Sequence, residues 1–228
     1  MTSFAEQAWA SVGGRFADVV AHPFVTSLAD GSLPHETFVR YLVDDAHYLL
    51  SYARTLAAIA ARMPDADGVA TLAAASAGAI EAERGLHRGF LVPLGIDPDA
   101  SDAPPPTPTC RGYTGFLAEQ AAAAPVEVAM AAVLPCFRVY AEVGRRVATS
   151  AEGRPPGADL HGHPYRDWIA TYADDDFADA VRRAEQQCDR LAETSPRLVP
   201  RMLSAYAVST DWEWRFFDAP WRGEVGVG

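Results

Sequence analysis

Apolar residues recur every three or four positions along almost the whole chain, and polar residues occupy the positions between them. This period is typical of amphipathic α-helices, and no segment alternates persistently between apolar and polar residues as a half-buried strand would. The sequence therefore predicts an all-α protein with about seven or eight long helices in a compact bundle. We expect helices over 3–21, 24–30, 34–63, 69–91, 113–123, 125–148, 165–172, 177–191 and 195–217.

Turn-forming residues mark the expected ends of these helices. The His-Pro pair at 22–23 ends the first helix, because proline lacks the N–H that a helix interior needs. The serine of the Asp-Gly-Ser turn at 30–32 is expected to cap the next long helix, and the aspartates at 174–176 offer a later cap. The range 95–109 holds five of the 17 prolines and is expected to be a loop inside a single domain, 1–228.

Composition excludes several classes of function. The net charge is -11, and no basic run provides the positive surface that nucleic acid or an anionic membrane requires. All 19 basic residues are arginine, which excludes lysine Schiff bases and lysine-anchored pyridoxal phosphate. The most apolar stretch, 121–136, is interrupted by Pro125 and Glu127 and is too short to span a membrane. With no signal peptide at the N-terminus, we expect a cytoplasmic protein with no nucleic-acid or membrane partner.

The cysteines carry the most informative chemistry. Cys110, Cys136 and Cys188 are widely spaced and include no Cys-X-X-Cys pair, which suits a reducing compartment better than a disulfide framework or a zinc site. Tyr140 follows Cys136 by four residues and shares its helical face, so that a thiol and a phenol can line one pocket.

Two further pairs combine a reactive group with an aromatic residue at helical spacing. Asp45 precedes Tyr48, and Glu213 precedes Phe216. Such a set suits a flat heteroaromatic ligand, because aromatic faces stack on the ring, carboxylates bond its nitrogens and amino groups, and a thiolate adds to a ring carbon. Spacing alone also fits ordinary core residues, since a free cysteine such as Cys136 is among the most buried residue types.

These residues belong to segments that follow one another along almost the whole chain. The segments are His22-Pro23-Phe24-Val25, Leu28-Ala29-Asp30-Gly31-Ser32-Leu33-Pro34, Asp44-Asp45-Ala46-His47-Tyr48-Leu49, Glu81-Ala82-Glu83, Tyr113-Thr114, Leu134-Pro135-Cys136, Glu142-Val143-Gly144, Trp168-Ile169, Thr171-Tyr172 and Trp212-Glu213-Trp214. In this order they resemble the thiaminase II family, which is also called TenA. Because the cysteine is present, the resemblance is to the cysteine-containing branch, the aminopyrimidine aminohydrolases.

The resemblance implies a fold, an assembly and an activity. The fold is the helical bundle shared with haem oxygenase, the assembly is a homotetramer, and the setting is thiamin salvage in the cytoplasm. The implied enzyme needs no metal and no cofactor. It hydrolyses 4-amino-5-aminomethyl-2-methylpyrimidine to the 5-hydroxymethyl compound, and many members also cleave thiamin into pyrimidine and thiazole.

The resemblance also assigns site residues. Cys136 falls on the nucleophile, and Asp45 and Glu213 fall on the active-site carboxylates. The implied substrate-binding aromatics are Tyr48, Tyr113, Tyr140, Tyr172 and Phe216. We assign proton exchange with the pyrimidine nitrogen to Glu213 and orientation of the amino edge to Asp45, two roles that can be exchanged. A lowered pKa of the Cys136 thiol is a further hypothesis.

Two alternative functions remain open, and one acidic residue has a simple structural interpretation. Glu83 and His87 could provide half of a di-iron site, which would make the protein a haem-oxygenase-like oxidase. A non-catalytic protein that binds thiamin or a pyrimidine as a carrier or regulator is the other alternative. Asp44 adjoins Asp45 but points about 100° around the helix, so we interpret it as a solvated or salt-bridged surface acid.

Overall fold

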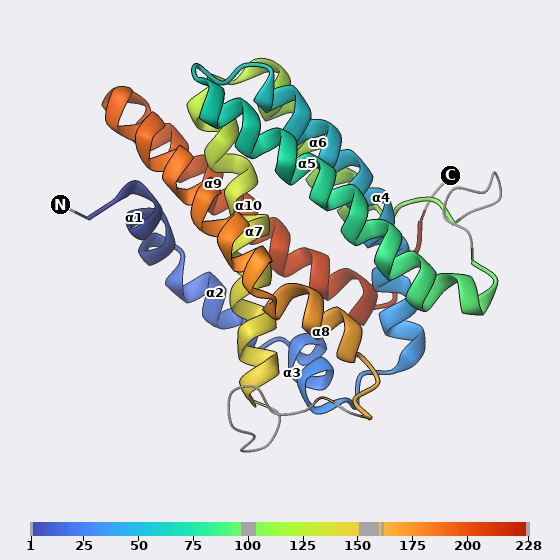
Figure 1. Cartoon of the computed structure of the whole chain (residues 1–228). Helices are drawn as coiled ribbons and strands as arrows, with labels where there is room; N and C mark the ends of the chain where they lie inside the picture. The colour runs from blue at the N-terminus through green and yellow to red at the C-terminus, as the bar shows by residue number, and fades with distance from the viewer. Residues whose placement is uncertain (1, 97–103, 151–159, 161, 227–228) are drawn as a thin grey trace.

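The structure is a computed structural model that describes residues 2–96, 104–150, 160 and 162–226. Every regular element among these residues is helical, which confirms the all-α prediction (Figure 1). The α-helices are α1 (Phe4–Ser11), α2 (Gly13–Val20), α3 (Pro23–Asp30), α4 (His35–Ala60), α5 (Ala66–Leu86), α6 (Pro108–Ala123), α7 (Val126–Ser150), α8 (Arg166–Ala173), α9 (Asp175–Thr194) and α10 (Val199–Trp221). Short turns of π-helix (His87–Leu91) and 3-10 helix (Val92–Leu94, Pro196–Leu198) complete the set.

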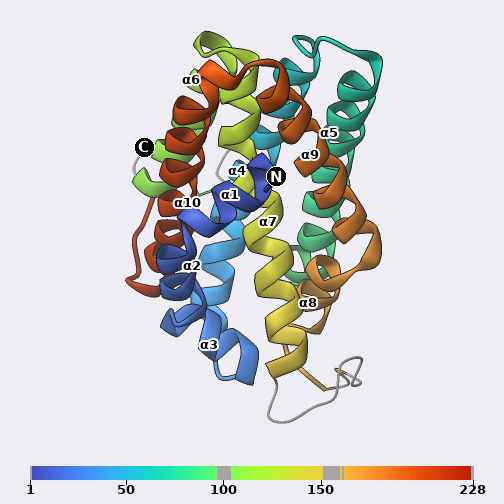
Figure 2. The ribbon, with the colours of Figure 1, turned by 90° about the vertical axis from the view of Figure 1, so that its left-hand side faces the viewer.

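Helix α7 is the centre of the bundle. It packs against α10, α8, α9, α6, α3 and α4, and Figure 2 shows it running between α9 and α10. Residues 128–134 are at most 3 % exposed, so this part of α7 is apolar on all sides, as expected of a central helix. Despite this apolar core, no described helix is both long and apolar enough to cross a membrane.

The first predicted helix, 3–21, is wrong in one respect, because the structure divides it into α1 and α2. The division falls at Val12, which ends α1 and precedes two glycines, Gly13 and Gly14. Glycine is less favourable in a helix interior than almost any other residue, which makes this the weakest point of the predicted helix. The change of direction lets α1 and α2 follow the surface of α10.

The starts of α4 and α6 also differ from the prediction in an informative way. Helix α4 begins at His35 with Pro34 at its N-cap, so Ser32 does not cap it. Helix α6 begins at Pro108, five residues before the predicted start, and the side chain of Thr107 caps it. A capping threonine followed by proline in the first helical position is a favoured start, because proline has no N–H to leave unsatisfied there.

Asp44 is buried, so the interpretation of this residue as a surface acid is wrong. The residue is 4 % exposed, and its carboxylate accepts hydrogen bonds from the backbone N–H of Thr107 at 2.9 Å and from the Thr107 hydroxyl at 2.5 Å. The start of α6 therefore lies over α4, and Asp44 joins the two helices.

Pro135 lies inside α7 and removes one backbone hydrogen bond from the helix. Carbonyl groups just before it are bonded by neighbouring helices. The Ser209 hydroxyl of α10 donates to the Ala132 carbonyl at 2.6 Å, and the Tyr52 hydroxyl of α4 donates to the Val133 carbonyl at 2.8 Å. These bonds fix α7 to α4 and α10 at the point where the helix is weakest.

Gly144 allows α8 to approach α7 closely. A Cβ atom at this position would lie 2.7 Å from the backbone carbonyl carbon of Tyr172 and 2.8 Å from its Cβ. Both distances are far below ordinary van der Waals contact, so only glycine leaves room for α8 here. As a consequence, Thr171 and Tyr172 lie beside the middle of α7.

Candidate active site

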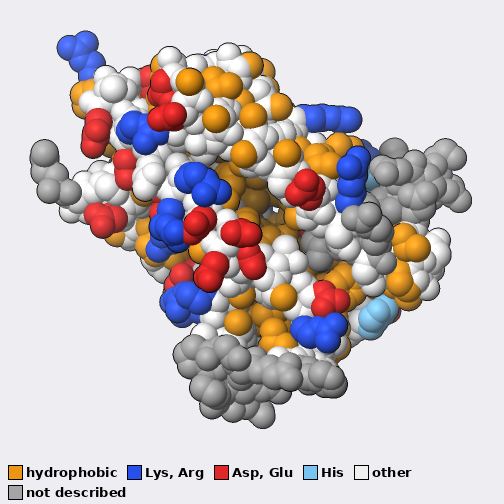
Figure 3. Space-filling view, in the orientation of Figure 1, with side chains coloured by type: hydrophobic (Ala, Val, Ile, Leu, Met, Phe, Trp, Pro, Cys, Tyr) orange, Lys and Arg blue, Asp and Glu red, His pale blue; other side chains and the backbone are white. Residues whose placement is uncertain are grey.

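A cavity of about 300 Å³ lies between α4, α5, α7, α8 and α9. It opens as an apolar hollow on the face shown in Figure 3, with charged side chains around it. Its lining residues are Asp45, Tyr48, Leu49, Tyr52, Thr71, Ala74, Ala75, Gly78, Ala79, Ala82, Cys136, Phe137, Tyr140, Thr171, Tyr172, Asp176, Phe177, Ala180 and Arg183. The volume is in the range of small-molecule sites.

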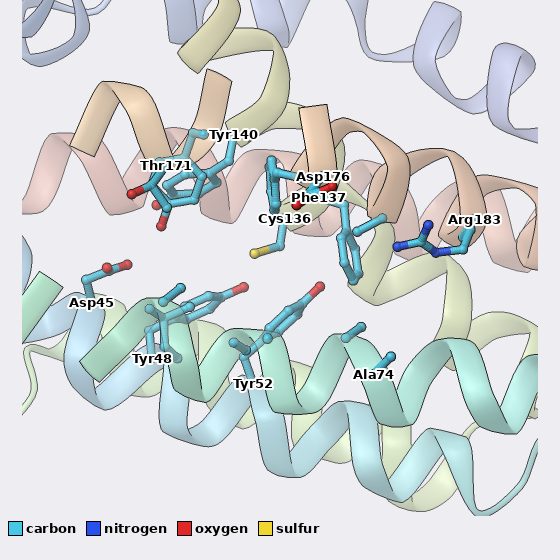
Figure 4. Close-up of a pocket in the computed structure, with 18 of the residues that line it drawn as sticks. Asp45, Tyr48, Tyr52, Ala74, Cys136, Phe137, Tyr140, Thr171, Asp176 and Arg183 are labelled. Carbon is cyan, nitrogen blue, oxygen red and sulfur yellow. The ribbon is translucent and has the colours of Figure 1, made fainter. Parts of the chain in front are cut away.

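Five of the predicted site residues line this cavity together. Asp45 and Tyr48 come from α4, Cys136 and Tyr140 come from α7, and Tyr172 comes from α8. Their spacing of three or four residues places each pair on the helical face that borders the cavity. Figure 4 shows the Cys136 sulfur pointing into the space above the Tyr48 ring, with Asp45 at one end. All five residues are at most 8 % exposed.

The other three predicted residues, Glu213, Tyr113 and Phe216, do not line the cavity. They are buried behind Tyr48, whose ring centroid lies 5.0 Å from that of Tyr113 and 5.2 Å from that of Phe216. The Tyr113 hydroxyl donates a hydrogen bond to Glu213 Oε1 at 2.5 Å. This carboxyl group therefore lies one side chain away from the cavity surface.

The Tyr48 hydroxyl is a buried polar group to which a bound ligand can hydrogen-bond. The residue is 2 % exposed, and its hydroxyl makes no hydrogen bond of ordinary geometry with a described residue, although it lies near the Cys136 thiol. Buried hydroxyl groups nearly always have a partner, because leaving one unpaired costs about 1–3 kcal/mol. Since Tyr48 lines the cavity, a polar atom of a bound molecule can supply the partner.

Tyr41, which belongs to the pattern that resembles the family, and Tyr52 lie at the site, but the sequence analysis assigned neither a role. The Tyr41 hydroxyl lies 3.1 Å from the Tyr140 hydroxyl and 3.5 Å from Asp45 Oδ1, and it accepts a bond from Trp168 Nε1 at 3.4 Å. Tyr52 lines the cavity. Positions 41, 45, 48 and 52 follow the spacing of one helical face, so the periodicity of α4 contained the signal.

The environment of Cys136 opposes ionisation of its thiol. Burial raises the pKa of the thiol well above its ordinary value, and the nearby Glu213 raises it further. The Tyr48 and Tyr52 hydroxyls act in the opposite direction but are outweighed. The hypothesis of a lowered thiol pKa is therefore wrong for this arrangement, because burial dominates the effect of the neighbouring donors.

Glu213 is a carboxylic acid with an unusually high pKa. Burial raises its pKa to about 8, the negative charge of Asp45 adds to this effect, and the hydrogen bond from Tyr113 counteracts it in part. The side chain is therefore protonated at neutral pH and can donate a proton. Perturbed groups of this kind are concentrated at functional sites.

The two remaining cysteines lie in the core away from the cavity. Cys110 is 1 % exposed and donates to the Asp44 carbonyl at 3.5 Å, and Cys188 is fully buried. Within the part of the chain that the structure describes, no group of three or more His, Cys, Asp and Glu side chains could hold a metal ion. The side chains of Glu83 and His87 lie outside the described residues.

Comparison with solved structures identifies the architecture. The chain superposes on the TenA homologue from P. horikoshii OT3 with a TM-score of 0.83, 23% sequence identity, and coverage of 97% of this chain and 99% of that one. A TenA-like thiaminase structure from Sulfolobus solfataricus gives a TM-score of 0.78 at 23% identity and covers 98% of both chains. The protein thus has the helical, haem-oxygenase-like fold of TenA homologues, as predicted.

Sequence comparison then identifies the family. A model of the TENA/THI-4/PQQC family matches residues 9–223, and the chain belongs to this family. An aminopyrimidine aminohydrolase of Bacillus subtilis is 31% identical over 226 residues, which cover 97% of this chain and 91% of that protein. A thiamine biosynthesis multifunctional protein, ThiED, of Corynebacterium efficiens is 33% identical over 94% of this chain but is much longer, with 28% of it covered.

Proposed function

We propose that this protein is a hydrolase of thiamin metabolism that converts 4-amino-5-aminomethyl-2-methylpyrimidine to its 5-hydroxymethyl counterpart and ammonia. We propose thiamin, with a thiazole leaving group, as a second substrate. The observation that carries this proposal is a thiol, Cys136, inside a cavity walled by phenols and a carboxylate. The similarity to the aminopyrimidine aminohydrolase of Bacillus subtilis over nearly the whole chain supports it.

The size and walls of the cavity suit a single heteroaromatic ring with a substituent. A volume of about 300 Å³ holds a small ligand, and the Tyr48 and Tyr140 rings offer faces for stacking. Asp45 lines the same end and can accept hydrogen bonds from the amino group of the pyrimidine. We therefore place the pyrimidine between these residues, with its 5-methylene carbon beside Cys136.

In the proposed reaction, the Cys136 sulfur adds to the ring carbon next to a ring nitrogen. The π electrons of the C=N bond move to that nitrogen, which is protonated and keeps one lone pair. This remaining lone pair then pushes through the ring and expels the amine or thiazole from the exocyclic methylene. Water adds to this methylene, the sulfur leaves, and the nitrogen loses its proton. The net change is replacement of the leaving group by hydroxyl, and Cys136 is regenerated.

Proton movements follow from the burial of these groups. The thiol of Cys136 is protonated at rest, so its proton must leave as the sulfur adds. The ring nitrogen gains a proton in the same step, and coupling of the two transfers leaves no net charge in the cavity. We assign exchange with the ring nitrogen to Glu213, acting through the Tyr113 hydroxyl that it bonds and the neighbouring Tyr48 hydroxyl, because Glu213 itself does not line the cavity. Asp45 orients the amino edge.

The proposal includes the setting of the enzyme. It is a cofactor-independent, cytoplasmic protein of one domain, 1–228, that assembles as a homotetramer; membership of the TENA/THI-4/PQQC family supports this setting. Light scattering tests the assembly, with an expected mass four times that of the 24.5 kDa chain. A monomer would contradict it.

The decisive experiment compares product release by the native protein and by Cys136→Ser. Each protein is given the aminomethylpyrimidine and, separately, thiamin, and the hydroxymethylpyrimidine formed is quantified. We expect Cys136→Ser to lose at least about 10³-fold in turnover, because a hydroxyl is a far weaker nucleophile here. Cys110→Ser is the matched control, since its sulfur lies outside the cavity, and it should retain activity.

Other results would point elsewhere. Full activity of Cys136→Ser would eliminate the proposed nucleophile. Binding of both pyrimidines to the native protein without turnover would support a carrier or regulator, and iron found in the purified protein by elemental analysis would support the oxidase alternative.

A further inference from the structure

The cavity has two ends of different character. Asp45 lies at one end, and Ala74 and Arg183 lie at the other, with Cys136 between them (Figure 4). Asp176 of α9 lies between Cys136 and Arg183 in this view. We call the part bordered by α9 the outer end, because its charged side chains are exposed whereas those beside Cys136 are buried.

Two charged side chains at the outer end, those of Asp176 and Arg183, form no ion pair with another described residue. Neighbouring acidic groups on α9 do have partners, since Glu185 pairs with Arg138 at 2.8 Å and Asp179 pairs with Arg182. Asp176 and Arg183 border the cavity, and among the described residues neither takes part in an ion pair. One negative and one positive charge therefore face whatever occupies this end.

The leaving group of a substrate must point to this end. If Asp45 holds the amino edge of the pyrimidine, the buried end of the cavity is filled by the ring, and the substituent on the methylene projects past Cys136 towards α9. Phe137 and Phe177 line the same cavity as Asp176, and Figure 4 shows Phe137 close to Asp176. A carboxylate next to aromatic rings is a favourable environment for an organic cation.

The leaving groups of the proposed substrates are such cations. A thiazolium nitrogen carries a permanent positive charge, and a primary alkylamine is protonated at neutral pH. The hydroxymethyl product is neutral, so a carboxylate does not attract it through charge. A carboxylate at this position thus favours the substrate over the product.

We propose that Asp176 is a specificity-determining residue that favours cationic leaving groups, thiazolium and alkylammonium, and that Arg183 opposes it by repulsion. This inference rests on the proposed function, because that function sets the direction in which the pyrimidine lies in the cavity. The charge of the outer end acts on binding and not on the chemical step. Substitution of either residue therefore changes the affinity for cationic ligands in opposite directions.

Calorimetric titration tests this inference in the Cys136→Ser background, where thiamin is not consumed. Asp176→Asn should weaken thiamin binding about three-fold, and Arg183→Gln should strengthen it by a similar factor, as expected of partly exposed charges. Both effects should shrink as salt is raised to about 1 M. Asp175→Asn is the matched control, because it makes the same change in net charge on an exposed side chain that does not line the cavity.

The neutral hydroxymethylpyrimidine separates charge selection from damage to the site. Its affinity should be the same in all four proteins. Equal weakening of thiamin binding by Asp176→Asn and Asp175→Asn would overturn the inference, because only net charge would then matter. Equal loss of thiamin and product affinity in Asp176→Asn would also overturn it. Turnover by the native protein tests the proposed function separately, since a charge preference in binding does not require catalysis.

Discussion

The buried end and the outer end of the cavity are built in different ways. At the buried end, side chains hold one another: Tyr113 bonds Glu213, and Tyr41 bonds Tyr140. At the outer end, the cavity-lining residues of α5 are threonine, alanine and glycine, and α9 contributes exposed charges that form no ion pair with another described residue. The difference indicates that reactive groups are held in place at the buried end, whereas the outer end selects ligands by space and charge. Substitutions at the two ends should therefore affect kcat and KM differently.

Glu213→Gln should have the largest effect, because it removes the proton donor and keeps the shape of the side chain. We expect kcat to fall by about 100-fold, the usual contribution of a general acid. The native protein should lose activity as the pH rises through about 8, where Glu213 ionises. This limb of the pH profile should be missing in Glu213→Gln. An unchanged limb in the variant would assign it to another group.

The same substitution should change stability in the opposite direction from activity. The pKa of Glu213 is raised to about 8 in the folded protein and is near 4.5 in the unfolded chain. Below about pH 4.5 both states are protonated, but as the pH rises towards 8 only the unfolded state gains by ionising, so the native protein loses stability. Glu213→Gln should escape this loss, which is on the order of 3–4 kcal/mol between pH 5 and pH 8. Thermal unfolding of both proteins at pH 5 and pH 8 measures it.

Gly144→Ala should damage the buried end through the backbone. The added methyl group would lie 2.7 Å from the Tyr172 carbonyl carbon, so α8 must move away from α7. We expect a loss of about 1–3 kcal/mol in unfolding free energy, as in other overpacked contacts. We also expect about a ten-fold loss in kcat/KM, because displacement of Tyr172 loosens the cavity wall.

Gly115→Ala is the control for Gly144→Ala. It lies in helix α6, and a Cβ there meets nothing within 4 Å. Alanine in that position should stabilise the protein by about 0.5–1 kcal/mol. If Gly144→Ala unfolds at the same temperature as the native protein, the close approach of α8 is not what fixes Tyr172.

The parts of the fold that could be predicted depend on local chemistry. The proline after His22 and the capping aspartate Asp174 end and begin helices through their own backbone and side-chain bonds, so the sequence shows them directly. The start of α6 at Thr107 carried a similar local signal that the proline-rich loop obscured. Asp44 was misplaced because its burial depends on α6, which lies 63 residues away in the chain.

The residues of the candidate site also fall into two groups: those that a local pattern or the family resemblance predicted, and those whose position depends on packing between helices. Helical spacing brought Asp45 and Tyr48 to one face, and the family resemblance pointed to Cys136. The position of Glu213 behind Tyr48 depends on how α10 packs against α4, which no local pattern reveals. Asp176 and Arg183 were missed for the same reason, because only the packing of α9 beside α5 makes them border a cavity.

Ala74→Leu should have the smallest effect and acts only at the outer end. Ala74 lies on the wall opposite Arg183 at the same end of the cavity, and its side chain is exposed (Figure 4). A leucine there should reduce the space for a thiazole ring and raise KM for thiamin about five-fold, within the range for added methylene groups in a pocket. KM for the aminomethylpyrimidine, whose leaving group is small, should change less than about two-fold.

Ala73→Leu provides the control for Ala74→Leu, since Ala73 is exposed on the same helix but does not line the cavity. It should leave both KM values unchanged. An equal rise in KM for both substrates in Ala74→Leu would mean that α5 borders the pyrimidine and that the leaving group points elsewhere. A rise for thiamin alone, with kcat retained, would separate the two ends: the buried end performs the chemistry, and the outer end accepts or rejects the leaving group.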